Sequence, residues 1–502
     1  MGSARPFARV RDLLVPAAAA LLLAPVSGQE TREAETKPAP KKVLAIRADW
    51  VLTLAGEGLG AIEHAVVLIE DGKVKAVGTG LEIPPGAEVI EAAGTTVAPG
   101  FIDARSALPV DPGALREERA IGPALDALDA VDPFAKEAIE EALRNGVTAV
   151  HIGPGRRGTI GGKTAVLKLK PGRLPSETVL RRAAAMRGSV GATKAGPATP
   201  IARIGEVRAL REQFRGAKKY REAWEDWREA RKEFEEERAK RAKEAPKESE
   251  SRPAEERSET PPARERGRRR PPRDAEEGFG EVPEAGEEAL AAQERKEPES
   301  KPAEKKEEPL KAPDRPAFDA DKEALLEVLD RKLPLWVEAH RAEDILNVLA
   351  VAKEFDLDLV LEGATEAVRI AKEIAASEVP VVLGPPLVGE DAPPELAENM
   401  PAAAARMHAA GVKLALGSSG ADPAQTRFLP LQAALAASAG LDPIAALRAV
   451  TVEAARLCGV DDRLGAIAPG RDADLVLFDG DPLKTGTKVR AVIVDGEVVF
   501  RP

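Results

Sequence analysis

The chain is poor in cysteine and histidine: its 502 residues include one cysteine, Cys458, and four histidines. A single cysteine cannot form an internal disulfide, so the folded state must be stabilised by its hydrophobic core. The shortage of histidine also limits metal binding, because a hydrolytic zinc site typically needs three protein ligands and an open coordination position. The positions of the few histidines therefore decide whether such a site can exist.

Positive charge is also in deficit, and the apolar run near the N-terminus is short. The net charge of −11 opposes binding to phosphate backbones, which argues against a nucleic-acid partner. The apolar run over residues 13–24 is too short to span a bilayer, where about 20 residues are needed. Three arginines precede it and small residues follow it, so residues 1–28 are predicted to be a secretory signal peptide, with a polar linker over 29–42. We expect an exported protein, periplasmic or secreted, with no stable membrane span after cleavage.

Both ends of the remaining chain consist of short apolar runs separated by turn formers, a pattern typical of β-strands. Asp71-Gly72 lies between two such runs and predicts a tight hairpin, and Asp495-Gly496 does the same near the C-terminus. Neither block has enough strands for a stable domain of its own. We therefore predict that residues 43–98 and 463–502 pair into one small composite β-sandwich.

Between these blocks, short apolar runs alternate with helical patterns. A helical pattern over residues 132–144 ends at Asn145-Gly146 and is followed by the apolar run Val147 to Ile152. Strands and helices in this order are typical of parallel βα units. The predicted fold is therefore α/β, with a (β/α)8 TIM-like barrel formed by residues 99–204 and 315–462.

The sequence between the two barrel segments has a different composition. Apolar residues recur at three- and four-residue steps on a highly charged background, which predicts a long amphipathic helix over residues 205–242. Its charged face most simply lies in solvent, and binding to a partner is the alternative. Residues 243–314 are rich in Pro, Glu, Lys and Arg with almost no large apolar side chains, so they are predicted to be a disordered insertion.

The segment Val97 to Ala107 carries the most informative motif. Its sequence V-A-P-G-F-I-D-A-R-S-A resembles the P-G-hydrophobic-I-D-x-H-x-H entry to the barrel of the amidohydrolase superfamily. The tail A-P-G-R-D-A-D-L, from Ala468 to Leu475, resembles the imidazolonepropionase-like branch of that superfamily. The resemblance implies a hydrolase fold in which the two histidines of the first motif hold a divalent metal. In this chain Arg105 and Ala107 stand at those positions.

The resemblance implies further ligand positions, and most of them are changed. Arg105 cannot replace a histidine ligand, because a guanidinium has no lone pair for a metal and carries a repelling charge. His340 stands where the fifth-strand histidine belongs and is the best catalytic candidate. Gly363 takes the sixth-strand histidine position, and Ser419 replaces the proton-transferring aspartate after the eighth strand. Lys168 is a candidate for the fourth-strand ligand, with an ordinary surface lysine as the simpler interpretation.

The other histidines do not complete the set: His64 belongs to the predicted β-sandwich, His151 to an early strand and His408 to a predicted surface helix. Oxygen ligands could come from Asp103, Glu338, Asp344 or Glu362, but they would make a different kind of metal centre, for which the spacing gives no signature.

We therefore predict a pocket at the barrel mouth without a metal. Its arginines suit a carboxylate or another anion, through charge and bidentate hydrogen bonds. The predicted pocket residues are Asp103, Arg105, His340, Arg341, Gly363 and Ser419.

The sequence favours an exported pseudoenzyme, an amidohydrolase-family protein with a degenerate metal site and a noncatalytic binding or accessory role. One alternative is a hydrolase of non-peptide carbon–nitrogen bonds in a cyclic amide or dipeptide-like substrate, which would use zinc or another divalent metal. A second is an interaction scaffold that uses the charged helix and the disordered insertion. The expected partner is a small-molecule ligand, and a homo-oligomer stays open because enzymes of the family are commonly oligomers.

Overall fold

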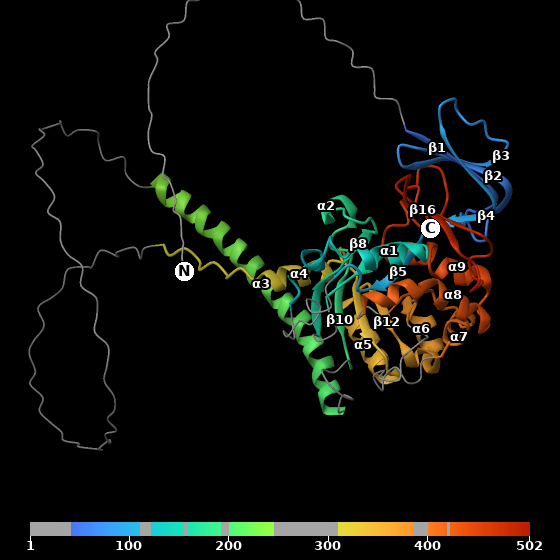
Figure 1. The fold of residues 1–502 in the computed structure, drawn as a ribbon. Helices are drawn as coiled ribbons and strands as arrows, with labels where there is room; N and C mark the ends of the chain where they lie inside the picture. The colour runs from blue at the N-terminus through green and yellow to red at the C-terminus, as the bar shows by residue number, and fades with distance from the viewer. Residues whose placement is uncertain are drawn as a thin grey trace, which may run out of the picture.

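The computed structural model describes residues 42–110, 122–154, 159–191, 200–244, 310–384, 400–418 and 422–502. The predicted signal peptide, the linker up to residue 41 and residues 245–309 of the predicted insertion lie outside this part of the chain. Among the described helices, none is both long and apolar enough to cross a membrane. The described strands form sheets of seven, six and four strands, with helices packed around the two smaller ones (Figure 1).

The seven-stranded sheet is built from both ends of the chain. In sheet order, its strands are β17 (Glu497–Phe500), β16 (Val489–Val494), β15 (Leu475–Phe478), β4 (Glu88–Pro99), β1 (Val43–Leu52), β2 (Ala61–Glu70) and β3 (Lys73–Thr79). The antiparallel pairing of β15 with β4 joins the two ends, and Leu477 lies opposite Val97. One buried apolar cluster includes Ile46 from the first end and Ile493 from the last. The ends therefore share one sheet, and its division into two packed layers of a sandwich stays a prediction.

The two predicted Asp-Gly hairpins are present, and they contact each other. Asp71 and Gly72 have φ of 52° and 79°, and Asp495 and Gly496 have φ of 50° and 71°. These left-handed conformations match the two-residue turns that connect twisted antiparallel strands. A Cβ atom on Gly72 would lie 2.8 Å from the carbonyl oxygen of Asp495, so glycine is needed there for the close approach as well as for φ.

The two smaller sheets contain the strands between the chain ends. The six-stranded sheet has the order β14 (Leu414–Leu416), β13 (Val381–Leu383), β12 (Leu359–Gly363), β11 (Leu335–Ala339), β10 (Met186–Ser189) and β7 (Ile160–Lys163), and the four-stranded sheet has the order β5 (Phe101–Ser106), β6 (Val147–Ile152), β8 (Ala165–Lys168) and β9 (Val179–Arg181). Neighbouring strands from β10 to β14 are parallel, as are β5 and β6. The mixed α/β class is thus confirmed, while a closed eight-stranded barrel stays a prediction.

Most of the helices are short and connect or cover these strands. They are α1 (Lys136–Arg144), α2 (Pro175–Thr178), α4 (Ala320–Leu329), α5 (Ala342–Phe355), α6 (Ala371–Ser377), α7 (Ala403–Ala409), α8 (Leu429–Ser438), α9 (Pro443–Ala449) and α10 (Val452–Leu457), with 3-10 turns η1 (Ala127–Ala130), η2 (Thr365–Ile370) and η4 (Pro423–Phe428). Helices α5, α6 and α7 each lie between consecutive parallel strands, the predicted βα order. Ala454 of α10 joins Ile102 and Trp336 in one buried hydrophobic cluster.

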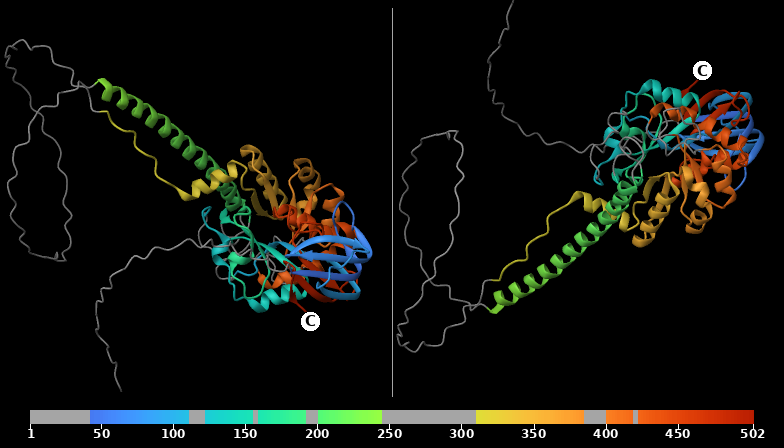
Figure 2. Two further views of the ribbon diagram at one scale, coloured as in Figure 1. Left: turned by 90° about the horizontal axis from the view of Figure 1, so that it is seen from above. Right: turned by 90° about the horizontal axis from the view of Figure 1, so that it is seen from below.

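Helix α3 (Pro200–Glu244) is the one long helix of the described chain, with 45 residues and a length of about 67 Å at 1.5 Å per residue. Its first half is packed: Leu210 and Phe214 are fully buried, and the Phe214 ring lies 5.5 Å from that of Phe355 on α5. Its second half extends away from the sheets, with residues 310–319 alongside (Figure 2). There the Arg315 guanidinium covers the rings of Trp224 and Trp227, which shields the apolar stripe from water.

Candidate functional site

Arg105 lies at the centre of the polar interior. It stands near the end of β5, its side chain is 0% exposed, and its Nη2 donates to Oε1 of Glu338 on β11 over 2.6 Å. Glu338 is equally buried, at 1%. A charged pair at this distance neutralises the guanidinium internally. In this structure the carboxylate partner of Arg105 belongs to the chain itself, and the binding of an outside anion by Arg105 stays a prediction.

His340 completes a cluster with these two residues. It follows β11, and its Nε2 lies 3.0 Å from the same Glu338 oxygen that accepts from Arg105. Its Nδ1 lies 2.9 Å from Oγ1 of Thr365 at the start of η2. Both ring nitrogens are therefore engaged by neighbours. We refer to Arg105, Glu338 and His340 together as the central cluster.

Asp103 lies beside the central cluster on β5 and is fully buried. Its Oδ1 accepts hydrogen bonds from the backbone N–H of Ser418, over 2.8 Å, and from that of Arg105, over 3.1 Å. Burial raises the pKa of Asp103, although the hydrogen bonds from Ser418 and Arg105 oppose that rise. Ser418 also donates its hydroxyl to the Arg105 carbonyl over 3.1 Å. The predicted pocket residue Ser419 lies outside the described residues, and its neighbour Ser418 makes these contacts.

Of the two remaining predicted pocket residues, Gly363 lies beside His340, whereas Arg341 has no described contact with the central cluster. Gly363 ends β12 with φ of +77°, and a Cβ atom there would lie 2.4 Å from Cε1 of His340. The His340 ring thus lies where a side chain at 363 would begin, and the two predicted positions are adjacent. Arg341 instead stands at the start of α5, where its Nη1 is 3.9 Å from Oε1 of Glu343. It makes no described contact with the central cluster.

A second buried ion pair lies next to the central cluster and was not predicted. Nε of Arg187 on β10 donates to Oε2 of Glu362 on β12 over 2.8 Å, and the two side chains are 6% and 1% exposed. Glu362 is the register partner of Glu338, so the two carboxylates lie on neighbouring strands. The sequence does contain a signal for this pair: Glu338 and Glu362 stand at the same place in two consecutive predicted strands. Two buried carboxylates each need a cationic partner.

His151 also belongs to this interior, although its position on an early strand gave no reason to expect it there. Its ring packs edge-on against Trp336, with centroids 4.2 Å apart. Nδ1 lies 3.1 Å from the Ala104 carbonyl and therefore carries the proton it donates, while Nε2 is 2.7 Å from Oγ1 of Thr164. Burial lowers the pKa of His151 to about 3, with a smaller contribution from the charge of Arg187. This histidine is a neutral packing residue.

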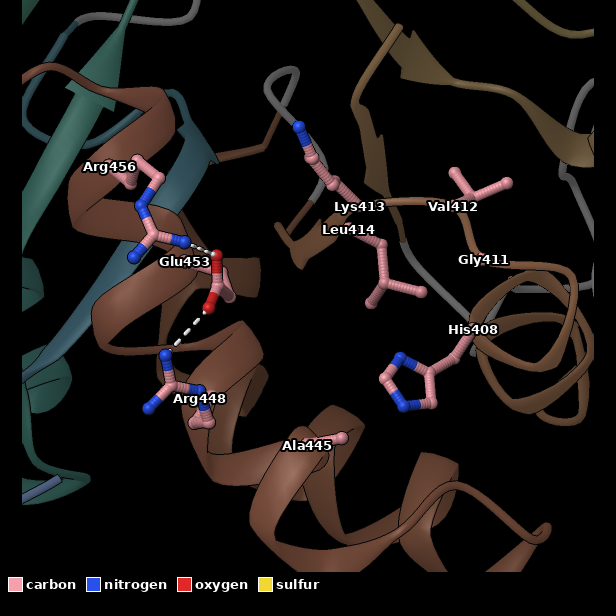
Figure 3. A pocket seen from close by; sticks show the side chains of 9 residues that line it. All are labelled: His408, Gly411, Val412, Lys413, Leu414, Ala445, Arg448, Glu453 and Arg456. Atoms are coloured by element: carbon pink, nitrogen blue, oxygen red, sulfur yellow. Dashed lines mark hydrogen bonds and ion pairs between the residues drawn. The ribbon is translucent and has the colours of Figure 1, made fainter. Parts of the chain in front are cut away.

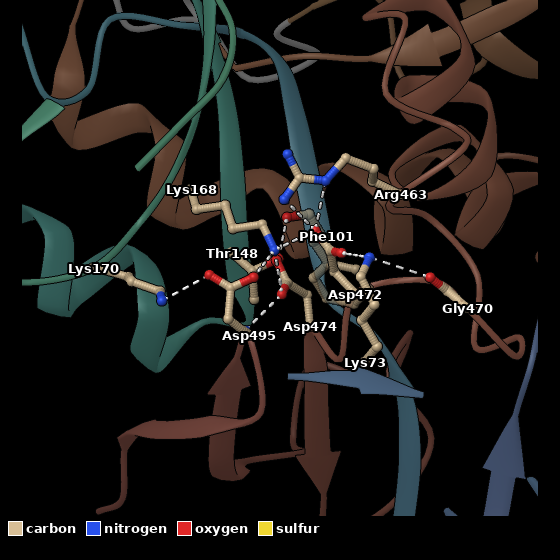
Figure 4. A network of polar contacts seen from close by, with 10 residues as sticks. All are labelled: Lys73, Phe101, Thr148, Lys168, Lys170, Arg463, Gly470, Asp472, Asp474 and Asp495. Carbon is tan, nitrogen blue, oxygen red and sulfur yellow. Dashed lines mark hydrogen bonds and ion pairs between the residues drawn. The ribbon is translucent and has the colours of Figure 1, made fainter. Parts of the chain in front are cut away.

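Lys168 is neither a fourth-strand ligand of the central cluster nor a surface lysine. It is 4% exposed at the end of β8 and donates to Asp472 over 2.9 Å and to Asp474 over 2.8 Å, with Asp495 as a third partner (Figure 4). Two of these aspartates belong to the tail motif and the third to the last hairpin turn. Lys168 therefore ties the four-stranded sheet to the seven-stranded one.

The last two histidines lie away from the interior. His64 is exposed on β2, and His408 is exposed on α7. His408 points into a separate pocket of about 290 Å³, across from Glu453, which pairs with Arg448 and Arg456 (Figure 3). Neither histidine has a described contact with the central cluster.

The residues that the structure describes at the implied ligand positions do not fit the divalent metal that the resemblance implies. Arg105 stands at one of the implied histidine positions and brings a positive charge. Gly363 stands at another, and the His340 ring leaves no room for a side chain there. Among the described residues, no group of three or more His, Cys, Asp or Glu side chains is arranged to hold a metal ion. The donor set is instead that of a hydrogen-bonded ion-pair network.

Comparison with known proteins gives this geometry a context. The model of the amidohydrolase family matches residues 313–499. The crystal structure of an amidohydrolase from Thermotoga maritima MSB8 is similar with a TM-score of 0.65 and 26% identity, covering 91% of this chain and 100% of that chain.

Curated relatives match over shorter stretches. An adenine deaminase from Nitratidesulfovibrio vulgaris (strain DP4) is 46% identical over 67 residues, which are 13% of this chain and 11% of the deaminase. Amidohydrolase tasK from Hapsidospora irregularis is 43% identical over 70 residues, 14% of this chain and 7% of that protein. The chain therefore matches only a small part of the length of these relatives.

Proposed function

We propose that this chain, which belongs to the amidohydrolase superfamily, is an exported noncatalytic binding or accessory protein. The observation that carries the proposal is the fully buried ion pair between Arg105 and Glu338, with His340 on the same carboxylate oxygen. Metal-dependent hydrolysis needs a cation that lowers the pKa of a bound water. Here a guanidinium supplies the positive charge at that point, and it offers neither a coordination position nor a water-activating centre.

The neighbours of the central cluster support the same proposal. Each ring nitrogen of His340 already has a partner, and the His340 ring lies against Gly363. Asp103 accepts hydrogen bonds from two backbone N–H groups, and burial raises its pKa. His340, through both ring nitrogens, and Asp103, through Oδ1, are thus held in structural interactions.

Metal analysis tests this proposal directly. The purified mature protein is incubated with zinc, manganese or iron, dialysed, and its metal content measured, with His340→Ala as the control. We expect well under one metal ion per chain in both proteins. Stoichiometric metal in the natural protein that disappears in His340→Ala would overturn the proposal. A thermal-shift screen of small carboxylates and amides then looks for the ligand.

A second candidate function is hydrolysis of a non-peptide carbon–nitrogen bond, in a cyclic amide or a dipeptide-like substrate. The likeness to the Thermotoga maritima amidohydrolase, which extends over 91% of this chain, favours it. Its test is turnover of a cyclic amide such as hydantoin and of an N-acyl amino acid, with and without added zinc. Turnover that is lost in both Asp103→Asn and His340→Ala would replace the first proposal with this one.

A further inference from the structure

A cationic pocket lies where the helices meet the C-terminal strands, and no residue of the central cluster lines it. Its volume is about 560 Å³, within the range of pockets that hold small molecules. Three separate parts of the chain form it: the end of α1, the η4–α8 segment and the C-terminal segment from β15 to β17, chiefly the loop between β15 and β16. Its lining residues are Arg144, Asn145, Arg427, Phe428, Pro430, Leu431, Ala434, Phe478, Pro482, Lys484, Thr485, Thr487, Lys488, Val489 and Phe500.

The charge in this pocket is of one sign. Four of the lining residues are Arg or Lys, and among the described lining residues none is Asp or Glu. Arg427 has an acidic partner outside the lining, Glu141 on α1. Arg144, Lys484 and Lys488 form no ion pair with any residue that the structure describes. Asp479 lies close to Lys488: the Lys488 backbone N–H and, less strongly, the charges of Arg490 and Lys488 lower the pKa of Asp479. Even so, cations are in excess around the pocket, and in a chain of net charge −11 such an excess favours binding of an anion.

The walls of the pocket are aromatic and apolar. Phe428, Phe478 and Phe500 contribute rings, and prolines and aliphatic side chains fill the rest. The guanidinium of Arg427 lies 4.6 Å from the centre of the Phe428 ring, and that of Arg144 lies 5.9 Å from the centre of the Phe500 ring. These stacking contacts place two cations beside apolar surface. A ligand that complements both features has a flat apolar body and a negative group.

Arg427 is held in position from inside the protein. The preceding residue, Thr426, is fully buried, and its Oγ1 lies 2.6 Å from Oγ of Ser106 at the end of β5. Arg427, which follows Thr426 in the chain, is partly exposed and lines the pocket. Because Glu141 and the Phe428 ring fix the guanidinium from two sides, Arg427 loses little conformational entropy when it binds a ligand.

We propose that this pocket binds a small aromatic or similarly flat apolar molecule that carries an anionic group, a carboxylate or a phosphate. The aromatic side chains enclose the apolar body, while Arg144, Lys484 and Lys488 at the pocket attract the anionic group. The site is separate from the central cluster, so it does not depend on whether the chain hydrolyses any substrate.

Isothermal titration of the full chain with three matched probes tests this site: phenylacetate, phenylacetamide and phenyl phosphate. Phenylacetate and phenylacetamide differ mainly in charge, so we expect the carboxylate to bind roughly tenfold or more tightly than the amide, the effect of one charged hydrogen bond. Tighter binding of phenyl phosphate than of phenylacetate would identify a phosphate as the anionic group. Absence of binding by both anions, or equal binding of the amide and the carboxylate, would overturn the proposal.

Variants locate the binding. Lys484→Gln combined with Lys488→Gln removes two exposed cations without touching the core, and we expect anion affinity to fall roughly tenfold. Lys372→Gln on α6 is the matched control, since it removes an exposed lysine elsewhere and should leave the affinity unchanged. Arg144→Gln should weaken anion binding as well. Unchanged affinity in both the double variant and Arg144→Gln would place any binding elsewhere and overturn the proposal.

Discussion

Arg105 and Glu338 are 233 residues apart in the sequence, yet their side chains meet over 2.6 Å with 0% and 1% exposure. The pair lies on two different sheets, since Arg105 is on β5 and Glu338 on β11. A buried ion pair of this kind repays the cost of its own desolvation only while both partners are present. The central cluster is therefore a structural unit whose members are mutually dependent.

Arg105→Met should lower the free energy of unfolding by about 3–5 kcal/mol, because it leaves the Glu338 carboxylate buried without its guanidinium. Urea denaturation followed by circular dichroism measures the change. Arg173→Met is the control: its pair with Glu177 is 51% and 46% exposed, so a loss of under about 1 kcal/mol is expected. Equal losses in the two variants would show that the buried pair does not stabilise the fold.

Gly363→Ala should destabilise the chain more than Gly172→Ala. The two glycines have similar φ values, +77° and +71°, so the backbone strain of a Cβ atom is nearly the same. Only at Gly363 would the new atom meet the His340 ring, at 2.4 Å, whereas nothing lies within 4 Å at Gly172. The difference should be about 1–3 kcal/mol, the usual cost of overpacking. Matching urea midpoints for the two variants would refute the interpretation that the His340 ring occupies the space that a side chain at position 363 would need.

Local features of the fold could be predicted from the sequence, and partners across the interior could not. Asp71-Gly72 and Asp495-Gly496 were predictable because the φ values of a tight turn depend on the two residues themselves. Their mutual contact was not, since it depends on how β4 and β15 pair. Helix α1 begins at Lys136, later than its periodicity suggested, and Phe134 is 82% exposed.

The site shows the same limit. Arg105 was predictable as the residue that replaces a histidine, because it stands at the end of a strand after a recognisable turn. Its pairing with Glu338 and that of Arg187 with Glu362 depend on the order of strands in the sheets, which residue spacing does not encode. The expectation that Lys168 is a surface lysine was wrong for the same reason. Its partners Asp472 and Asp474 are distant in the sequence, and only the folded chain brings them to the lysine.

Lys168→Met should cost about 3–5 kcal/mol of stability, because three aspartates would then share the interface between two sheets without their central cation. Lys73→Met is a matched control. Both lysines lie 2.9 Å from Asp472, but the side chain of Lys73 is 56% exposed and that of Lys168 only 2%. The control should lose under about 1 kcal/mol. Equal urea midpoints would show that burial of the ammonium adds nothing to the interaction.

The free energy of unfolding should decrease as the pH is lowered from about 6.5 to 3, because His151 is buried. Burial lowers the pKa of His151 to about 3 in the folded chain, while in the unfolded chain the ring protonates near its ordinary value of about 6.5. In this window the unfolded state binds the extra proton, so the stabilising contribution is complete above about pH 6.5 and is lost as the pH falls toward 3. The slope attributable to one such group is at most about 1.4 kcal/mol per pH unit.

His151→Gln should remove that slope from urea unfolding curves recorded between pH 7.5 and 5, where few carboxylates titrate. His64→Gln, at an exposed position, is the control and should retain the slope. Identical pH profiles for the natural chain and His151→Gln would mean that the buried ring is protonated as readily as a solvated one.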